Sequence, residues 1–290
     1  EKLKILGGTY VLPLSVNYRG IFYNKKLLEE EGYQIPSTYA ELIDTMQQIK
    51  KAGKLPIIFA DKDSWTIHQG WDAIDMSSRG SQDDFFQNVL NGDAFLYEDS
   101  IALDSTRKFL EIRKYGQKQT VNTGYDEAVK KFANGEAYMF FQGNWAYPMI
   151  KKINPDIDLL FMPFPAYHEN QAKVVVKIDA TLGVSASCKH LEAVEQFLDY
   201  VFSKNVSEYY ADKAGAYSCI KSVDVEDSYA KAFTDSIRSG EFFLEEFAYE
   251  TEKSDAINAL FQNFISSPQR DTEKSFLKEL NDLLIQQKGD

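Results

Sequence analysis

The sequence predicts an α/β or α+β fold built around a mixed β-sheet. Strand-like and helix-like segments alternate through the first half of the chain, whereas helical periodicity dominates after residue 221. The chain has 290 residues, of which 44% are hydrophobic and 14% aromatic, so it can bury one large core or two medium ones. No low-complexity linker divides it.

Caps and alternating residues define the first elements. A strand that breaks at Pro13 is followed by a second strand over 20–23. Asn24 is expected to cap a short helix, and Thr38 and Glu41 form a capping box that opens a longer one. Later strands are expected over 55–60, 136–141, 156–165, 172–178 and 181–187, and later helices over 82–91, 104–116, 125–134, 190–203 and 271–288.

Charge and cysteine content exclude several classes of partner. The net charge is −12, which argues against nucleic acid or an anionic membrane surface as the main partner. Cys188 and Cys219 lack the spacing of a zinc site, and a disulfide between them is left open. We expect neither a metal nor a cofactor. Because the sequence begins at Glu1 without an initiator Met, we expect a chain that starts inside a longer product or after processing.

No motif for catalysis is present. The sequence has no Ser-His-Asp signature, phosphate-binding loop or HExxH motif. A pair of carboxylates could serve glycoside hydrolysis, but the chain has 44 acidic residues and no reason to select two of them. We therefore expect a protein that is not an enzyme, with a glycoside hydrolase as the less favoured alternative.

The segment FFQGNWAYPMIKK, residues 140–152, places one of three tryptophans just after a strand-to-helix glycine. A flat indole can cover the C–H face of a sugar ring while hydroxyls bond to polar neighbours such as Asn144. Gly143 would let the backbone pass close to a ligand. The alternative is that Trp145 anchors the core at a strand–helix junction.

Four segments in order resemble the family 1 extracellular solute-binding proteins, the carbohydrate-binding subunits of ABC transporters that include maltose-binding protein. The segments are LPLSVNYRGIFYNKKLLEEEG at 12–32, PSTYAEL at 36–42, FANGEAYMFFQGNWAYPMIKKINPDIDLLFMPFP at 132–165 and LGVSASCKHLEAVEQFLDYVFSKNVSEYYADKAGAYSCIKSV at 182–223. Each is weak alone, but their order and spacing cover nearly the whole chain.

The resemblance implies a periplasmic-binding-protein-like type II fold with two α/β lobes and a ligand cleft between them. Residues 1–18 would finish the N-terminal lobe and enter the hinge, and 165–222 would return to that lobe. Residues 19–164 and 223–290 would form the C-terminal lobe. The early part of the N-terminal lobe has no counterpart in this sequence, so that lobe would be incomplete and ligand binding by this chain weak or absent.

The same resemblance implies ligand-binding residues. Trp145 and Trp65 would stack on sugar rings, and Asp63 would accept hydrogen bonds from hydroxyls. Trp71 is expected in the core, and His68 is expected to be an ordinary polar side chain. Further contacts are expected from residues at the hinge crossings and in the return segment, which are Asn17, Tyr18, Asp179 and Tyr217, and a stacking aromatic from Phe247 or Tyr249.

The function implied is that of an exported importer subunit. It would capture a di- or oligosaccharide as a monomer and deliver it to a membrane permease, either as a cell-surface lipoprotein or in the periplasm. Arg19 would favour an acidic sugar if it faced the cleft. The alternative within the same fold is binding of a ferric ion or another small solute, with the adjacent Tyr209 and Tyr210 as iron ligands.

Overall fold

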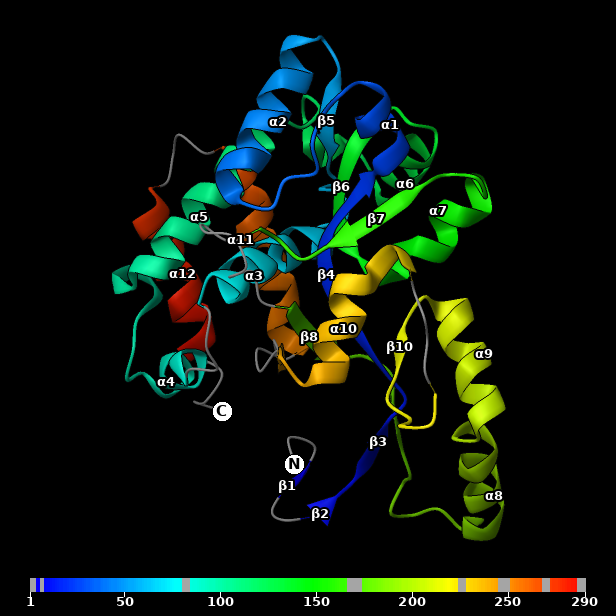
Figure 1. Ribbon diagram of the computed structural model, residues 1–290. Helices are drawn as coiled ribbons and strands as arrows, with labels where there is room; N and C mark the ends of the chain where they lie inside the picture. Colours follow the sequence, from blue (N-terminus) through cyan, green and yellow to red (C-terminus); the bar gives the residue numbers. More distant parts are fainter. Residues whose placement is uncertain are drawn as a thin grey trace.

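The structure is a computed structural model that describes residues 4–5, 8–79, 84–165, 174–223, 228–244, 251–267 and 272–285. A mixed sheet of seven strands forms its centre (Figure 1). The strands of this sheet are β4 (Ser15–Asn24), β5 (Leu55–Ile58), β6 (Ala137–Gly143), β7 (Leu159–Met162), β8 (Val174–Ile178), β10 (Tyr217–Ser218) and β11 (Phe242–Leu244).

The long strand β4 organises the sheet. Its second half pairs antiparallel with β6 and β7, and its first half pairs antiparallel with β8 and β10. The sheet then extends through two parallel pairs, β5 with β6 and β11 with β8. Two short ribbons lie off this sheet, β1 (Lys4–Ile5) with β2 (Gly8–Thr9) and β3 (Val11–Pro13) with β9 (Thr181–Gly183).

Helices cover both faces of the sheet. Ile21 and Tyr23 of β4 belong to one hydrophobic cluster and Phe22 to a second, because successive side chains of a strand point to opposite faces. The first cluster lies under α2 (Tyr39–Lys51), α3 (Trp65–Arg79), α5 (Ser100–Arg113), α11 (Thr251–Ser266) and α12 (Glu273–Ile285). The second lies under α6 (Tyr125–Ala133), α7 (Tyr147–Ile153) and α10 (Lys231–Ser239).

The predicted caps are confirmed. Asn24 Oδ1 accepts from Leu27 N–H at the start of α1 (Lys25–Glu30), at 3.2 Å. Thr38 and Glu41 form the expected capping box of α2. The remaining short elements are α4 (Phe85–Asn91), η1 (Leu96–Glu98), η2 (Thr120–Asn122), η3 (Asn144–Ala146) and η4 (Ser228–Ala230).

One sequence expectation about strands was wrong, and one strand was not expected. The second strand begins at Ser15, not at residue 20, because its first half gains the partners β8 and β10, which are distant in sequence. The C-terminal part is mostly helical, as expected, but it also contributes β11, an unexpected strand that pairs in parallel with β8. Neither pairing leaves a local sequence signal.

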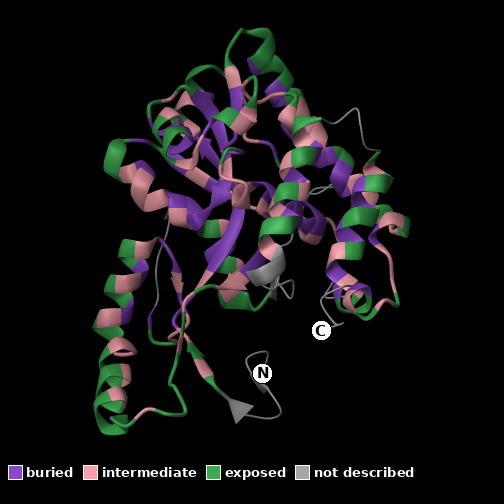
Figure 2. Cartoon of the chain, turned by 180° about the vertical axis from the view of Figure 1, so that it is seen from behind, coloured by how far each residue is buried: buried purple, intermediate pink, exposed green. Residues whose placement is uncertain are grey.

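The helices α8 (Leu191–Val201) and α9 (Lys204–Ala214) form an arm set apart from the sheet (Figure 1). No residue of α8 is buried, and Phe197 and Tyr200 are 55% and 65% exposed (Figure 2). Of the apolar residues of this helix, Leu191, Phe197 and Tyr200 are exposed, whereas Val194, Leu198 and Val201 are partly buried. The expected lobe boundaries stay a prediction. Among the described residues, no helix has the length and apolarity to cross a membrane.

Candidate functional site

Three aromatic side chains meet beyond the carboxyl ends of the parallel strands β5 and β6. Trp65 begins α3 after β5, and Trp145 lies in η3 after β6. Their ring centroids are 6.2 Å apart with the planes at 51°, and Trp65 lies 5.4 Å from the ring of Tyr125 at 56°. We call Trp65, Tyr125 and Trp145 the aromatic cluster. In α/β sheets, ligands bind outside the carboxyl ends of strands, which is where this cluster lies.

The loop that carries Trp65 is held by hydrogen bonds. Asp63 accepts from the backbone N–H of Tyr125 at 2.6 Å, which satisfies one free donor at the start of α6. Thr66 Oγ1 donates to the carbonyl oxygen of Ala60 at 3.1 Å. Asp61 forms a two-atom contact with the Arg113 guanidinium at 3.2 and 3.3 Å. Asp63 therefore joins the two elements that present Trp65 and Tyr125.

Gly143 allows Trp145 to adopt its position. A Cβ atom built on Gly143 would collide with the six-membered ring of the Trp145 indole. The glycine φ is −92°, an ordinary value, so the requirement is space and not backbone conformation. The expected close approach thus occurs within the chain, between the Gly143 backbone and the indole that follows it.

Several buried polar atoms of the aromatic cluster, or of residues close to it in sequence, have no hydrogen-bond partner within the described residues. Trp145 Nε1 and the Tyr125 hydroxyl belong to the cluster itself. Gln69 Oε1 lies on α3 one turn after Trp65, and Gln142 Nε2 belongs to the residue before Gly143. Buried polar groups in native proteins are normally paired. This group of atoms is what a polar ligand or ordered water would satisfy.

The hinge residues predicted as ligand contacts lie close together but are engaged with the protein. Tyr18 is 1% exposed, and its ring stacks on Phe233 with centroids 4.4 Å apart. Asn144 is fully buried and accepts from the Tyr18 backbone N–H at 2.9 Å. It also donates to Asn17 Oδ1 at 3.3 Å. Direct contact of these three residues with a ligand stays a prediction.

Of the remaining predicted residues, Asp179 lies between β8 and β9 and Tyr217 lies in β10. Asp179 is exposed, and its backbone N–H donates to the carbonyl oxygen of Ser15, the first residue of β4. Tyr217 pairs with Val16 and lines a cavity of about 650 Å³ with Val176 and Phe242, on the sheet face of the second cluster. Phe247 and Tyr249 lie outside the described residues.

A buried polar network lies on α3 beyond Trp65. Arg19 Nη1 is 3.7 Å from Asp72 Oδ2, and both side chains are more than nine-tenths buried. His68 Nδ1–H donates to Asn258 Oδ1 of α11 at 2.8 Å. Burial, followed by the Arg19 charge, lowers the pKa of His68 to about 3. His68 is therefore neutral near pH 7.

Two other aromatic predictions can be compared with the structure. Trp71 is fully buried, and its indole N–H donates to Thr106 Oγ1 at 2.9 Å, as expected for a core residue. Tyr209, one of the two alternative iron ligands, is 67% exposed on α9.

The question of a disulfide, which the sequence left open, has an answer in the structure: Cys188 and Cys219 are free thiols.

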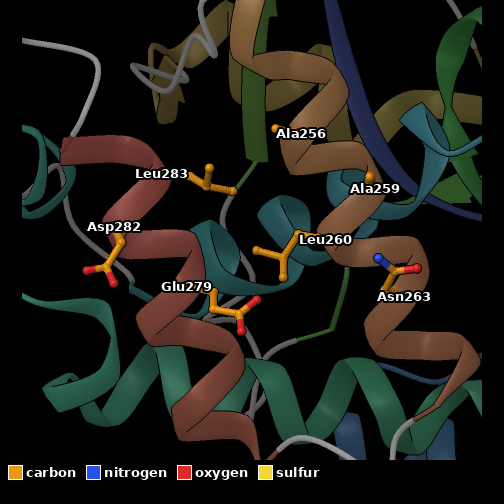
Figure 3. Close-up of a pocket in the computed structure, with 7 residues that line it drawn as sticks. All are labelled: Ala256, Ala259, Leu260, Asn263, Glu279, Asp282 and Leu283. Atoms are coloured by element: carbon orange, nitrogen blue, oxygen red, sulfur yellow. The ribbon is translucent and has the colours of Figure 1, made fainter.

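A shallow cavity of about 360 Å³ lies between α11 and α12, and no residue of the aromatic cluster lines it (Figure 3). Leu260 and Leu283 point into the space between the two helices, and Glu279 and Asp282 stand on α12 beside it (Figure 3). The residues that line this cavity include no aromatic side chain and no buried polar atom without a partner, in contrast to the aromatic cluster.

Sequence reasoning missed Tyr125, Gln69 and Gln142. Tyr125 is the first residue of α6 after Gly124, and an aromatic at a helix start has no special signal in one sequence. Gln69 lies one helical turn after Trp65, a spacing that could have pointed to it. Gln142 directly precedes the Gly143–Trp145 segment.

Comparison with known proteins supports the fold. The sequence profile of bacterial extracellular solute-binding proteins matches residues 2–207. In solved structures, a protein described as "SBP RafE in complex with raffinose" aligns with a TM-score of 0.84 at 24% identity, covering 99% of this chain and 75% of that one. A chitin oligosaccharide binding protein aligns with a TM-score of 0.81 at 19% identity, covering 99% of this chain and 74% of that one.

Curated relatives include two sugar-binding proteins. The multiple sugar-binding protein of Streptococcus mutans is 29% identical over 231 residues, 77% of this chain and 54% of the relative. The melibiose/raffinose/stachyose-binding protein MelE of Bacillus subtilis is 20% identical over 233 residues, 78% of this chain and 54% of the relative. The chain thus spans about half the length of these relatives. With the profile matched over residues 2–207 and the fold shared along the chain, this protein belongs to the bacterial extracellular solute-binding protein family.

Proposed function

We propose that this chain belongs to the sugar-binding subunit of an ABC importer. The observation that carries the proposal is the aromatic cluster of Trp65, Tyr125 and Trp145 with buried, unsatisfied polar atoms in and beside it. An apolar surface flanked by a few polar groups fits a carbohydrate, which has C–H faces and a rim of hydroxyls. The names of the relatives support the same class of ligand.

The proposed mechanism is capture without chemistry. Sugar rings stack on Trp65 and Trp145, and hydroxyls bond to Asp63 and to the free polar atoms of the cluster. Contacts made to both lobes would favour the closed state, as a shift between two populations. The loaded protein, exported as a lipoprotein or a periplasmic monomer, would then dock on a membrane permease.

The Arg19–Asp72 pair favours a neutral sugar over an acidic one. Arg19 would attract a carboxylate if its charge were available at the site, as in the sequence-based hypothesis of an acidic ligand. In the structure its guanidinium faces Asp72 at 3.7 Å in a buried setting. With Arg19 facing Asp72, a ligand carboxylate taken out of water would gain no ion pair from Arg19, and a buried unpaired ion costs several kcal/mol. Uronates are therefore disfavoured.

A thermal-shift screen of the full-length protein tests this function. Neutral oligosaccharides, uronates, amino acids and ferric citrate are compared, with Trp145→Ala beside the wild type. A ligand at a hundredfold its Kd adds about 2.7 kcal/mol of apparent stability. We expect a shift with a neutral oligosaccharide that is lost in the variant. A shift only with ferric citrate, or none with any sugar, would overturn the proposal.

A further inference from the structure

The η3 turn that carries Trp145 is attached to the rest of the protein by the preceding residue, Asn144. The side chain of Asn144 is fully buried, and its amide uses both of its donors and its acceptor. Oδ1 accepts from the backbone N–H of Tyr18 at 2.9 Å. Nδ2 donates to Asn17 Oδ1 at 3.3 Å and to the carbonyl oxygen of Gly215.

These partners come from two segments far from Asn144 in sequence. Asn17 and Tyr18 belong to β4, the long strand that organises the central sheet. Gly215 ends α9, the second helix of the exposed arm, in a left-handed conformation with φ of 62°. The Asn144 side chain therefore joins the turn that carries Trp145 both to β4 and to the end of α9 in the arm.

Close packing reinforces the link to the arm. A Cβ atom built on Gly215 would lie 2.7 Å from Pro148 Cδ and 3.0 Å from the Asn144 carbonyl oxygen. Contacts this short require atoms to shift, and here the Asn144 neighbour is backbone. The end of α9 and the start of α7 thus fit together without spare room.

We propose that Asn144 is a positioning residue for the Trp145 indole, which it holds in register with β4 and with the arm. This rests on the proposed sugar-binding function only for its effect on affinity. Trp145 follows Asn144 directly in a short turn, so a change in the amide bonds moves the indole. If the arm shifted relative to the sheet, the hydrogen bond from Asn144 to the Gly215 carbonyl would move Asn144, and Trp145 would move with it.

The test uses Asn144→Ala and a matched control, Asn154→Ala, in the full-length protein. Asn154 caps the C-terminus of α7, and its side-chain amide donates to the Ala133 carbonyl at 2.9 Å. This bond is comparable to those of Asn144, but Asn154 lies outside the η3 turn that carries Trp145. Tryptophan emission without ligand is recorded for each variant, also in a Trp145→Phe background. Affinity for raffinose is measured by calorimetry.

We expect Asn144→Ala to change the emission spectrum, to lose that change in the Trp145→Phe background, and to weaken raffinose binding at least tenfold. Asn154→Ala should lower the melting temperature yet keep wild-type emission and affinity. If Asn144→Ala is destabilised but keeps the wild-type emission spectrum, Asn144 is merely structural and the proposal fails.

A second variant, Gly215→Ala, tests the contact between the end of α9 and Asn144 from the side of the arm. Gly215→Ala introduces a Cβ against Pro148 and Asn144, so it should reproduce the emission change even if Asn144→Ala does not fold. Wild-type emission in a folded Gly215→Ala variant would contradict the coupling to the arm. Should the wild type bind no sugar, the proposed function fails, while the emission comparison still decides the positioning role.

Discussion

At the scale of single residues, the surroundings of each side chain decide what it does in the site. Trp65 and Trp145 contact each other, whereas Trp71 on the same helix as Trp65 is sealed in the core. His68, one turn after Trp65, is buried beside two cations and stays neutral. The same residue type therefore serves the site or the core according to which side of α3 it occupies.

Gly143 and Gly70 give opposite predictions for substitution by alanine. At Gly143 a methyl group would displace the Trp145 indole, so Gly143→Ala should cost about 1–3 kcal/mol of stability and weaken sugar binding. At Gly70, inside α3, a methyl group meets ring atoms at ordinary distances of 3.8 and 3.9 Å. Gly70→Ala should stabilise the protein by about 0.5–1 kcal/mol. Urea unfolding measures both, and equal effects would refute the steric argument.

Protonation of His68 should destabilise the protein in acid. Its folded pKa of about 3 lies below the ordinary value of 6.5, because of burial and the charges of Arg19 and Lys177. Between these values the unfolded chain binds a proton that the folded chain does not, so stability is full above pH 6.5 and falls as pH drops. The loss attributable to His68 should reach about 2 kcal/mol at pH 5.

The measurement is urea unfolding at pH 7.5 and pH 5. His68→Gln should show a smaller loss between the two pH values than the wild type. His190→Gln changes an exposed histidine and serves as the control. If His68→Gln lost as much unfolding free energy between pH 7.5 and pH 5 as the wild type, other groups would cause the acid sensitivity.

At the scale of elements, the site depends on how helix starts meet strand ends. The parallel pair β5–β6 brings the Trp65 and Trp145 segments to one edge of the sheet. The start of α6 reaches the same edge, because Asp63 accepts from the first backbone N–H of that helix. A side chain from the β5–α3 loop thus caps a helix 62 residues later and fixes the third aromatic residue.

Changes at Asp63 should separate the capping role from sugar binding. Asp63→Ala removes the acceptor of the Tyr125 N–H and should cost about 1–2 kcal/mol of stability. Asp63→Asn keeps an oxygen for the cap, so most of the stability should remain while the charge-assisted bond to a hydroxyl is lost. Unfolding midpoints and sugar affinity are measured on both. If both variants lose equal stability, the oxygen of Asp63 is not the cap.

At the scale of the whole molecule, the arm of α8 and α9 carries apolar residues that no other described part of this chain buries fully. Its residues Leu191, Phe197, Tyr200 and Tyr209 are exposed. Figure 2 shows the arm as mostly exposed and the central strands as mostly buried. A helix with an apolar face is stable in water when that face is buried against a partner. Exposed contiguous apolar surface of this kind is a site of association.

We expect this chain to bind the hydrophobic dye ANS through the arm. Phe197→Glu with Tyr200→Gln should lower ANS fluorescence markedly, because these residues are 55% and 65% exposed. Ile153→Gln on α7, where the side chain is 42% exposed, is the matched control and should change it little. Equal reductions by the two sets of changes would mean that the dye binds elsewhere.

The sequence by itself determined many of the local elements and the family. Caps at Asn24 and Thr38 have short-range causes and were predictable, as was the position of Trp145 after a glycine. Resemblance in four ordered segments predicted the family and the two-lobe fold, because the spacing of motifs survives at low identity.

Only the tertiary structure decided which predicted residues come together. It joined Tyr125 to Trp65 and Trp145, paired Arg19 with Asp72, and buried Asn144 against Asn17 and Tyr18 of β4. It also put Tyr217 beside a separate cavity. These outcomes rest on strand pairing and helix packing between segments that lie tens to more than a hundred residues apart. Such long-range contacts leave no periodic pattern in a single sequence, since each partner obeys its own local rules.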